Sequence, residues 1–161
     1  MNHRNLPSTK TMLPEKEFLH IVEHTPLVSI DLVIRNAAGA VLLGKRLNCP
    51  AKGTWFVPGG SIKKDERLAQ AMARISQREL GFVIDMADTK QLGAYEHLYP
   101  DNFAEAPGIS THYVVVAYSY QLPEGQVIQG DDQHDTLEWW DVETLLADPE
   151  VHDNTKAYFQ A

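Results

Sequence analysis

The spacing of apolar residues predicts two amphipathic helices in the first half of the chain. Residues 14–24, PEKEFLHIVEH, begin with proline and carry their apolar side chains on one side, which is typical of a short surface helix. A second helix is expected to begin near Asp65 and to end at Gly81. Its apolar stripe comprises Leu68, Ala71, Met72, Ile75 and Leu80.

Most other apolar segments are expected to be strands. Residues 27–35 and 40–46 flank the turn sequence NAAG, which predicts a hairpin. Further strands are predicted at 90–99, 110–122 and 136–141, and closing helices at 142–148 and 149–160. Because strands and helices interleave without the regular alternation of a doubly wound fold, we expect the α/β (α+β) class, with a mixed β-sheet sandwiched between helices.

Composition narrows the class of protein. A chain of 161 residues, 43% of them hydrophobic, is expected to form one domain over 13–161 after a flexible polar tail at 1–12. Cys49 is the single cysteine, and no segment approaches the ~20 apolar residues of a membrane span, so we expect a cytoplasmic protein without a membrane partner. The net charge of −8 disfavours nucleic acid as a partner.

Residues 60–82, GSIKKDERLAQAMARISQRELGF, carry the candidate chemistry. They are similar to the Nudix box, G-x5-E-x7-R-E-U-x-E-E-x-G-U with U a bulky apolar residue, and Gly60, Glu66, Arg74, Glu79, Gly81 and Phe82 fall in register. Ile75 and Arg78 stand where the pattern has glutamates, and Ser76 stands where it has an apolar residue.

These replacements leave a single carboxylate on one helix face. Positions 75, 78 and 79 share that face, so Glu79 is the carboxylate that remains. One carboxylate can hold a single Mg²⁺ if other oxygens converge, because Mg²⁺ usually combines one or two carboxylates with waters and phosphates. Without such ligands, Glu79 would be a solvated glutamate at a helix end.

Residues 18–159 as a whole resemble the GDP-mannose mannosyl hydrolases of the Nudix superfamily. The resemblance rests on TPLVSIDLVI, LLGKR, WFVPGG, KKDE, REL-G, YPDNF, THYVV, DDQHD and VHDNTKAYF. It implies Mg²⁺-dependent hydrolysis of GDP-mannose, and in some members GDP-glucose, to GDP and free sugar with inversion; Mn²⁺ could replace Mg²⁺. It also implies a homodimer whose sites border the interface, and the 14–24 helix could exchange between subunits.

This reaction accounts for the missing carboxylates. Water that attacks phosphorus approaches a group of anionic oxygens, which favours several cations. Water that attacks the anomeric carbon meets an oxocarbenium-like centre, and one metal ion can stabilise the departing diphosphate.

The resemblance also assigns residues to roles. It implies His134 as the general base and the Gly59 carbonyl, Glu79 and Gln133 as metal ligands. Asp31 would lie near the sugar, Arg46 and Arg74 would bind phosphate, and Tyr113 would contact the leaving diphosphate. Tyr99 and Phe103 could stack on guanine, and Lys45, His97 and His112 are weaker candidates for substrate binding. Ser61 stands where the family commonly has an arginine, which Lys63 or Lys64 could replace.

Each of these residues also has a structural interpretation. His134 could be a surface residue, Asp31 an inward carboxylate bonded to a backbone amide, Arg46 a strand-end charge and Arg74 a salt-bridge partner. Tyr99, Phe103 and Tyr113 could pack in the core. Two other functions remain open: an ordinary Nudix pyrophosphohydrolase that yields GMP and mannose 1-phosphate, which Ile75 and Arg78 disfavour, and a nucleotide-sugar-binding module without turnover.

Overall fold

The computed structural model describes residues 13–129 and 134–160, although not the side chains of residues 134 and 135. The predicted flexible tail, residues 1–12, lies outside these ranges. The helices are α1 (Glu15–His24), α2 (Leu68–Leu80), η1 (Met86–Asp88), α3 (Val142–Ala147), α4 (Asp153–Lys156) and η2 (Ala157–Phe159). The strands are β1 (Leu27–Arg35), β2 (Val41–Arg46), β3 (Trp55–Phe56), β4 (Gly59–Ser61), β5 (Lys90–Tyr99), β6 (Thr111–Gln121) and β7 (His134–Trp140).

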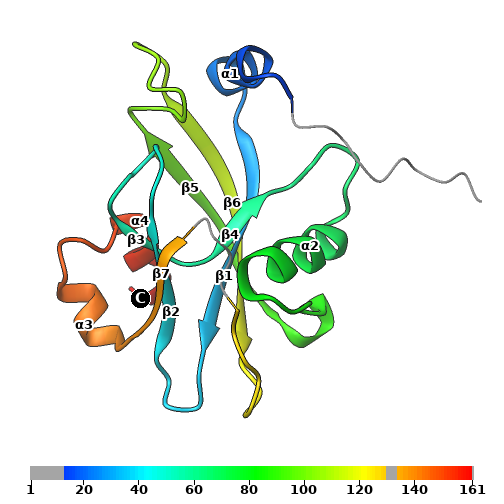
Figure 1. The fold of residues 1–161 in the computed structure, drawn as a ribbon, viewed down its shortest axis with the longest axis vertical. Coiled ribbons are helices and arrows are strands. Elements are labelled where there is room, and N and C mark those ends of the chain that lie inside the picture. The colour runs from blue at the N-terminus through cyan, green and yellow to red at the C-terminus, as the bar shows by residue number, and fades with distance from the viewer. Residues whose placement is uncertain (1–12, 130–133, 161) are drawn as a thin grey trace, which may run out of the picture.

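The predicted mixed sheet is confirmed. Its order is β3-β2-β1-β6-β5, with β4 paired to β1 and β7 paired to β2. β1 runs parallel to β6 and antiparallel to β2 and β4. Figure 1 shows α2 on one side of the strands and α3 with α4 on the other. The sheet is therefore covered by helices on both faces, as the sequence predicts.

Alternation along β1 separates two cores. Ile30, Leu32 and Ile34 are completely buried and pack with four residues of α2, Ala71, Met72, Ile75 and Leu80. Leu68, which was predicted to belong to this stripe, is exposed because it lies at the start of the helix. Val33 points to the opposite face, where it packs with Trp55 and Leu145. Because successive side chains of a strand alternate between faces, Asp31 shares the side of Val33 and faces away from α2.

The predicted hairpin is present, but β1 and β2 pair closely only beside the turn. Arg35 pairs with Val41, and the Asn36 side chain accepts hydrogen bonds from the amides of Ala38 and Ala40. Further along β1, residues 29–31 pair with β4 instead, and the Leu32 amide donates to the Pro58 carbonyl. The segment WFVPGG thus contributes two short strands, β3 and β4, that the sequence did not predict.

Helix α2 begins later than predicted and ends where predicted. Asp65 has φ = 65°, outside the right-handed helical region, so the helix begins at Leu68. Gly81 ends it with φ = 82°, a conformation that glycine adopts without steric cost. Ser76, at the apolar slot of the box, is completely buried, and its hydroxyl accepts a hydrogen bond from the Ile84 amide. This hydrogen bond offsets the cost of burying the serine hydroxyl.

The helix predicted at 149–160 is wrong in its extent. The Trp55 amide donates to the Glu150 carbonyl, the His152 amide donates to the Trp55 carbonyl, and Val151 forms a parallel bridge with Trp55. This extended pairing delays the helix to Asp153, and α4 passes directly into η2. Among the described residues, no helix is both long and apolar enough to cross a membrane.

Candidate active site

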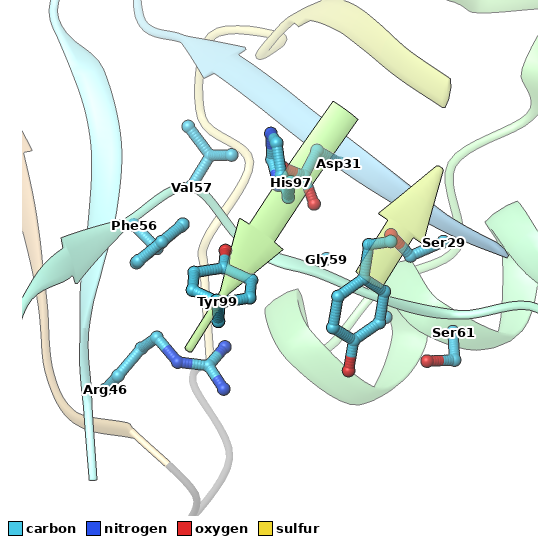
Figure 2. Close-up of a pocket in the computed structure, with 11 residues that line it drawn as sticks. Ser29, Asp31, Arg46, Phe56, Val57, Gly59, Ser61, His97 and Tyr99 are labelled. Carbon is cyan, nitrogen blue, oxygen red and sulfur yellow. The ribbon is translucent and has the colours of Figure 1, made fainter. Parts of the chain in front are cut away.

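A cleft of about 110 Å³ lies where β1 separates from β2. Its walls come from β1, β2, the β3–β4 segment, β5 and β6, and Figure 2 shows the side chains that face it. The lining residues are Ser29, Asp31, Arg46, Phe56, Val57, Gly59, Gly60, Ser61, His97, Tyr99 and Tyr113. The cleft brings together six predicted site residues that are far apart in sequence: Asp31, Arg46, Gly59, His97, Tyr99 and Tyr113.

Asp31 is held by a tyrosine from the end of the chain. The Tyr158 hydroxyl, on η2, donates a hydrogen bond to Oδ2 of Asp31 at 2.5 Å and lies 3.4 Å from Nε2 of His97. The Tyr158 ring packs edge-on against Tyr95, with ring centroids 4.7 Å apart. Asp31 is thus an inward carboxylate, as its structural interpretation has it, but among the described residues its recorded hydrogen-bond partner is the Tyr158 side chain and not a backbone amide.

Burial changes the ionisation of both acid–base groups in the cleft. Desolvation raises the pKa of Asp31 to about 7, although the Tyr158 hydrogen bond and the Arg46 charge lower it. Desolvation and the nearby His152 lower the pKa of His97 to about 4. Near neutral pH, His97 is therefore uncharged, and Asp31 exchanges readily between its charged and neutral forms.

The two glycines of β4 allow close approach of their neighbours. A Cβ atom on Gly59 would lie 2.5 Å from both Oδ1 of Asp31 and the Ile30 carbonyl oxygen. A Cβ on Gly60 would lie 2.8 Å from Nη2 of Arg78 and 3.1 Å from Cγ1 of Ile75. A side chain at position 59 would therefore displace the β1 backbone, whereas one at position 60 would require the Arg78 side chain to move and Ile75 to shift slightly.

The face of α2 that carries Glu79 differs from the Nudix pattern as the sequence indicates. Ile75 is completely buried in the core, so this position supplies packing in place of a ligand. Glu79 has an exposed fraction of 3%, and Nη2 of Arg78 lies 3.0 Å from its Oε1. The Arg78 guanidinium therefore occupies Oε1 of Glu79, and Glu79 is not among the residues that line the cleft. A buried carboxylate can serve as a ligand for one divalent ion, which would have to share this oxygen or use the other one.

Arg74 is engaged in a salt bridge and does not line the cleft. Its Nε and Nη2 atoms donate to the two carboxylate oxygens of Glu66 at 2.8 and 2.9 Å, and Nη2 also donates to the Ser61 carbonyl at 2.8 Å. These hydrogen bonds lower the pKa of Glu66. The bidentate pair joins the loop before α2 to the helix, which is the salt-bridge role and gives no support to phosphate binding by Arg74.

Arg46 is the guanidinium that reaches the cleft. Its Nε donates to the Pro50 carbonyl at 2.8 Å, and its Cζ lies 5.5 Å from the centroid of the Phe56 ring. This arrangement fixes the side chain while its terminal nitrogens face the cleft (Figure 2). The Arg46 charge also lowers the pKa of Tyr113, which burial raises more strongly. A fixed guanidinium beside a phenol is suited to bind an anionic group.

The aromatic and basic candidates divide between the cleft and other parts of the molecule. Tyr99 lines the cleft, and burial raises its pKa to about 12, so it stays a neutral donor. Phe103 does not line the cleft and packs against Phe18 of α1, with centroids 4.8 Å apart. Lys45 does not line it either, and its Nζ lies 5.9 Å from the centroid of the Trp55 ring.

Positions 133 and 134 carry two of the most specific predictions. Gln133 and the side chain of His134 lie outside the described residues. The His134 backbone pairs with Arg46 across β7 and β2, next to a register shift. The strand therefore brings position 134 to the same sheet edge as the arginine that faces the cleft.

Sequence reasoning missed three residues around the cleft. Tyr158 donates a hydrogen bond to Asp31, and the Phe56 ring contacts both the Arg46 guanidinium and the His152 ring, whose centroid lies 4.7 Å from that of Phe56. Tyr158 and His152 both belong to the tail sequence VHDNTKAYF, which was one of the segments that carry the family resemblance. Their place in this segment was the available signal.

Comparisons with known proteins agree on the fold. A family model described as NUDIX domain matches residues 25–161. The low-salt glycan biosynthesis protein Agl8 of Haloferax volcanii is 42% identical over 137 residues, which cover 84% of this chain and 83% of Agl8. An ADP-ribose pyrophosphatase of Methanocaldococcus jannaschii is 28% identical over 120 residues, covering 74% of this chain and 64% of that protein. The NUDIX domain of Shewanella oneidensis NrtR, solved with ADP ribose, has a TM-score of 0.62 and 25% identity, covering 91% of this chain and 96% of that chain.

Proposed function

The chain belongs to the NUDIX domain family, and from this premise we propose that it hydrolyses GDP-mannose, or the related GDP-glucose, to GDP and the free sugar. The observation that carries the proposal is the altered face of α2, where Ile75 is part of the core and Arg78 contacts the remaining carboxylate, Glu79. Such a site suits one metal ion. One ion is sufficient when water attacks the anomeric carbon and the diphosphate departs.

The similarity to Agl8 supports a sugar-containing substrate. That protein is named for glycan biosynthesis, and glycans are assembled from nucleotide-activated sugars. The ADP-ribose bound to the NrtR domain likewise joins a nucleotide diphosphate to a sugar. A nucleotide sugar is therefore the substrate class that the family relationship and the cleft jointly favour.

In this proposal Glu79, the Gly59 carbonyl and Gln133 hold one Mg²⁺, or Mn²⁺ in its place. Bound there, the ion supplies Lewis-acid stabilisation of the negative charge on the diphosphate. Arg46 binds a diphosphate oxygen through its fixed guanidinium, and the Tyr113 hydroxyl donates to the same group. These two side chains reduce the need for an acid that protonates the leaving group.

The sugar end of the cleft carries the acid–base groups. A charged Asp31, oriented by Tyr158, stabilises positive charge that develops at the anomeric carbon, and the neutral His97 can accept or donate a hydrogen bond to a sugar hydroxyl. His134 removes the proton from the attacking water. The uncharged Tyr99 side chain lies between these groups and Arg46 (Figure 2).

Hydrolysis in water enriched in heavy oxygen tests the proposal. We expect the label in the free sugar and none in GDP, as measured by mass spectrometry, and NMR of the first product should show the inverted anomer. Label in GMP or in mannose 1-phosphate would instead identify a pyrophosphohydrolase, the activity for which the Methanocaldococcus jannaschii relative is named. Binding of GDP-mannose without turnover in Mg²⁺ would identify a binding module.

We further propose that the protein is a homodimer with α1 at the interface. The helix packs on its own chain through Val22 and Phe18, while Leu13, beside its start, has an exposed fraction of 51%. Sedimentation at micromolar concentration should give a dimer. A monomer under these conditions would contradict this assignment.

A further inference from the structure

Helix α1 presents three metal-binding side chains on one surface. His20, Glu23 and His24 belong to the sequence HIVEH, in which the second and third residues follow the first by three and four positions. Residues with this spacing lie on the same face of a helix, about one turn apart. The cluster precedes the residues that match the NUDIX family model, 25–161, so it is a feature of this chain and not of that domain.

The ligand atoms of the cluster already converge. One nitrogen of each imidazole and one carboxylate oxygen of Glu23 lie within 4.8 Å of one another. The two histidine rings are 4.3 Å apart between centroids. Three ligands around a tetrahedral Zn²⁺ would be about 3.4 Å apart, given bond lengths of about 2.0–2.1 Å. All three side chains are exposed, so small rotations can close this difference without disturbing the core.

The orientation of His24 favours a metal ligand. Its Nδ1 lies 2.8 Å from the His20 carbonyl oxygen and 3.8 Å from Oε2 of Glu23. A carbonyl can only accept a hydrogen bond, so Nδ1 carries the proton, and Nε2 of the neutral ring retains its lone pair. Histidines that bind metals commonly donate their other ring N–H to a backbone carbonyl in this way, because the bond fixes the tautomer and the ring orientation.

We propose that His20, Glu23 and His24 form a surface site for a transition-metal ion of the Zn²⁺ class, with water completing the coordination. Two imidazoles and one carboxylate suit Zn²⁺, Ni²⁺ or Cu²⁺, whereas Mg²⁺ prefers oxygen ligands. The site is thus chemically distinct from the proposed Mg²⁺ site at Glu79. A bound ion joins successive turns of α1 and stabilises the helix that leads into β1.

Isothermal titration with Zn²⁺ tests the site. The full chain is freed of metal with a chelator and kept in excess Mg²⁺, so that oxygen-rich sites are occupied. We expect one equivalent of Zn²⁺ to bind in a manner that Mg²⁺ does not displace. His20→Ala and His24→Ala should each weaken this binding at least about tenfold, because each removes a nitrogen ligand. Glu17→Gln, on the same helix but outside the cluster, is the matched control and should bind as the unmodified protein does.

NMR of the unmodified protein provides a second measurement that does not depend on the variants. Zn²⁺ should shift the imidazole resonances of His20 and His24 before those of His97, His112 or His152. Failure of the unmodified protein to bind Zn²⁺, or full binding by the His20→Ala/His24→Ala double variant, would overturn the proposal. Hydrolysis of GDP-mannose at saturating Mg²⁺ should be unchanged in the double variant, so the result is independent of the proposed function.

Discussion

The Tyr158 hydroxyl donates a hydrogen bond of 2.5 Å to the Asp31 carboxylate across a sequence separation of 127 residues. The bond ties the end of the chain to the first strand of the sheet, at the point where β4 replaces β2 as the neighbour of β1. It fixes Oδ2 of Asp31, while Oδ1 faces the Gly59 backbone. The C-terminal segment is therefore part of the candidate site and not only a cover for the core.

Tyr158→Phe should impair both catalysis and stability. Loss of a hydrogen bond to a charged group costs about 1.5–3 kcal/mol, so kcat for GDP-mannose should fall roughly 10- to 100-fold if the bond acts in the transition state. The buried Asp31 loses its donor, so the free energy of unfolding should fall by about 1–3 kcal/mol. Steady-state kinetics and urea unfolding measure these effects.

Tyr120→Phe is the matched control for this substitution. Tyr120 packs near Phe82 on the α2 side of the sheet, away from the cleft. It should leave kcat unchanged. Equal loss of activity in the two variants would show that the Tyr158 hydroxyl has no specific role.

Asp31→Asn should change how stability depends on pH. The pKa of Asp31 is near 4 in an unfolded chain and about 7 in the folded protein, so the folded state binds more protons between these values. Its contribution to the free energy of unfolding therefore decreases as pH rises from about 4 to 7. His97 has the opposite effect, because its folded pKa of about 4 is below its unfolded value near 6.5.

In the unmodified protein, the pH-dependent contributions of Asp31 and His97 to the free energy of unfolding partly cancel. In Asp31→Asn only the His97 contribution remains, so the variant should gain stability relative to the unmodified protein as pH rises, by up to about 4 kcal/mol over the interval. Urea unfolding between pH 4.5 and 7.5, in the presence of a chelator, measures the difference. A difference that is constant with pH would show that Asp31 titrates normally.

Glu79→Gln should weaken metal binding and activity together. The substitution keeps the shape of the side chain but removes the negative charge that the proposed ion requires. Electron paramagnetic resonance with Mn²⁺ should show affinity reduced at least about tenfold, by analogy with the loss of a metal-orienting group. Unchanged Mn²⁺ affinity and rate would place the metal elsewhere.

Arg78→Ala should have the opposite effect on metal affinity. Nη2 of Arg78 contacts Oε1 of Glu79, so the guanidinium would compete with a metal ion for this carboxylate. Its removal should raise Mn²⁺ affinity. Arg78→Lys, which keeps a charge on a flexible chain, should show an intermediate affinity. Weaker binding by Arg78→Ala would mean that Arg78 supports the geometry of Glu79 instead of competing for it.

His134→Gln should lower kcat about 10²- to 10⁴-fold while the KM for GDP-mannose changes much less, because positioned proton transfer contributes to the chemical step. A base must be neutral to accept a proton. The decrease of kcat on acidification should therefore disappear in the variant. If the variant keeps the rate and the acid limb, another group activates the water, and Asp31 or His97 would be the next residue to replace.

The sequence pattern was sufficient to predict elements that are specified by neighbouring residues. The apolar stripe of α2 and its end at Gly81 follow from helical periodicity and from the left-handed conformation that glycine accepts. The spacing of Gly60, Glu66, Arg74 and Glu79 likewise indicated the Nudix box, and the match of residues 25–161 to the NUDIX domain family confirms this relationship. The start of α2 could not be predicted as well, because the backbone at Asp65 depends on the turn that Arg74 and Glu66 hold together.

Tertiary structure decided which predicted residues meet. The sequence contains Tyr158, Asp31 and His97, but their contact depends on the order of strands in the sheet and on the pairing of residues 150–152 with Trp55. Strand pairing joins segments that are distant in sequence, so no local pattern encodes it. The same holds for Arg74. Its guanidinium donates to Glu66 and to the Ser61 carbonyl and does not line the cleft, because both acceptors lie within reach once β4 and α2 have packed together.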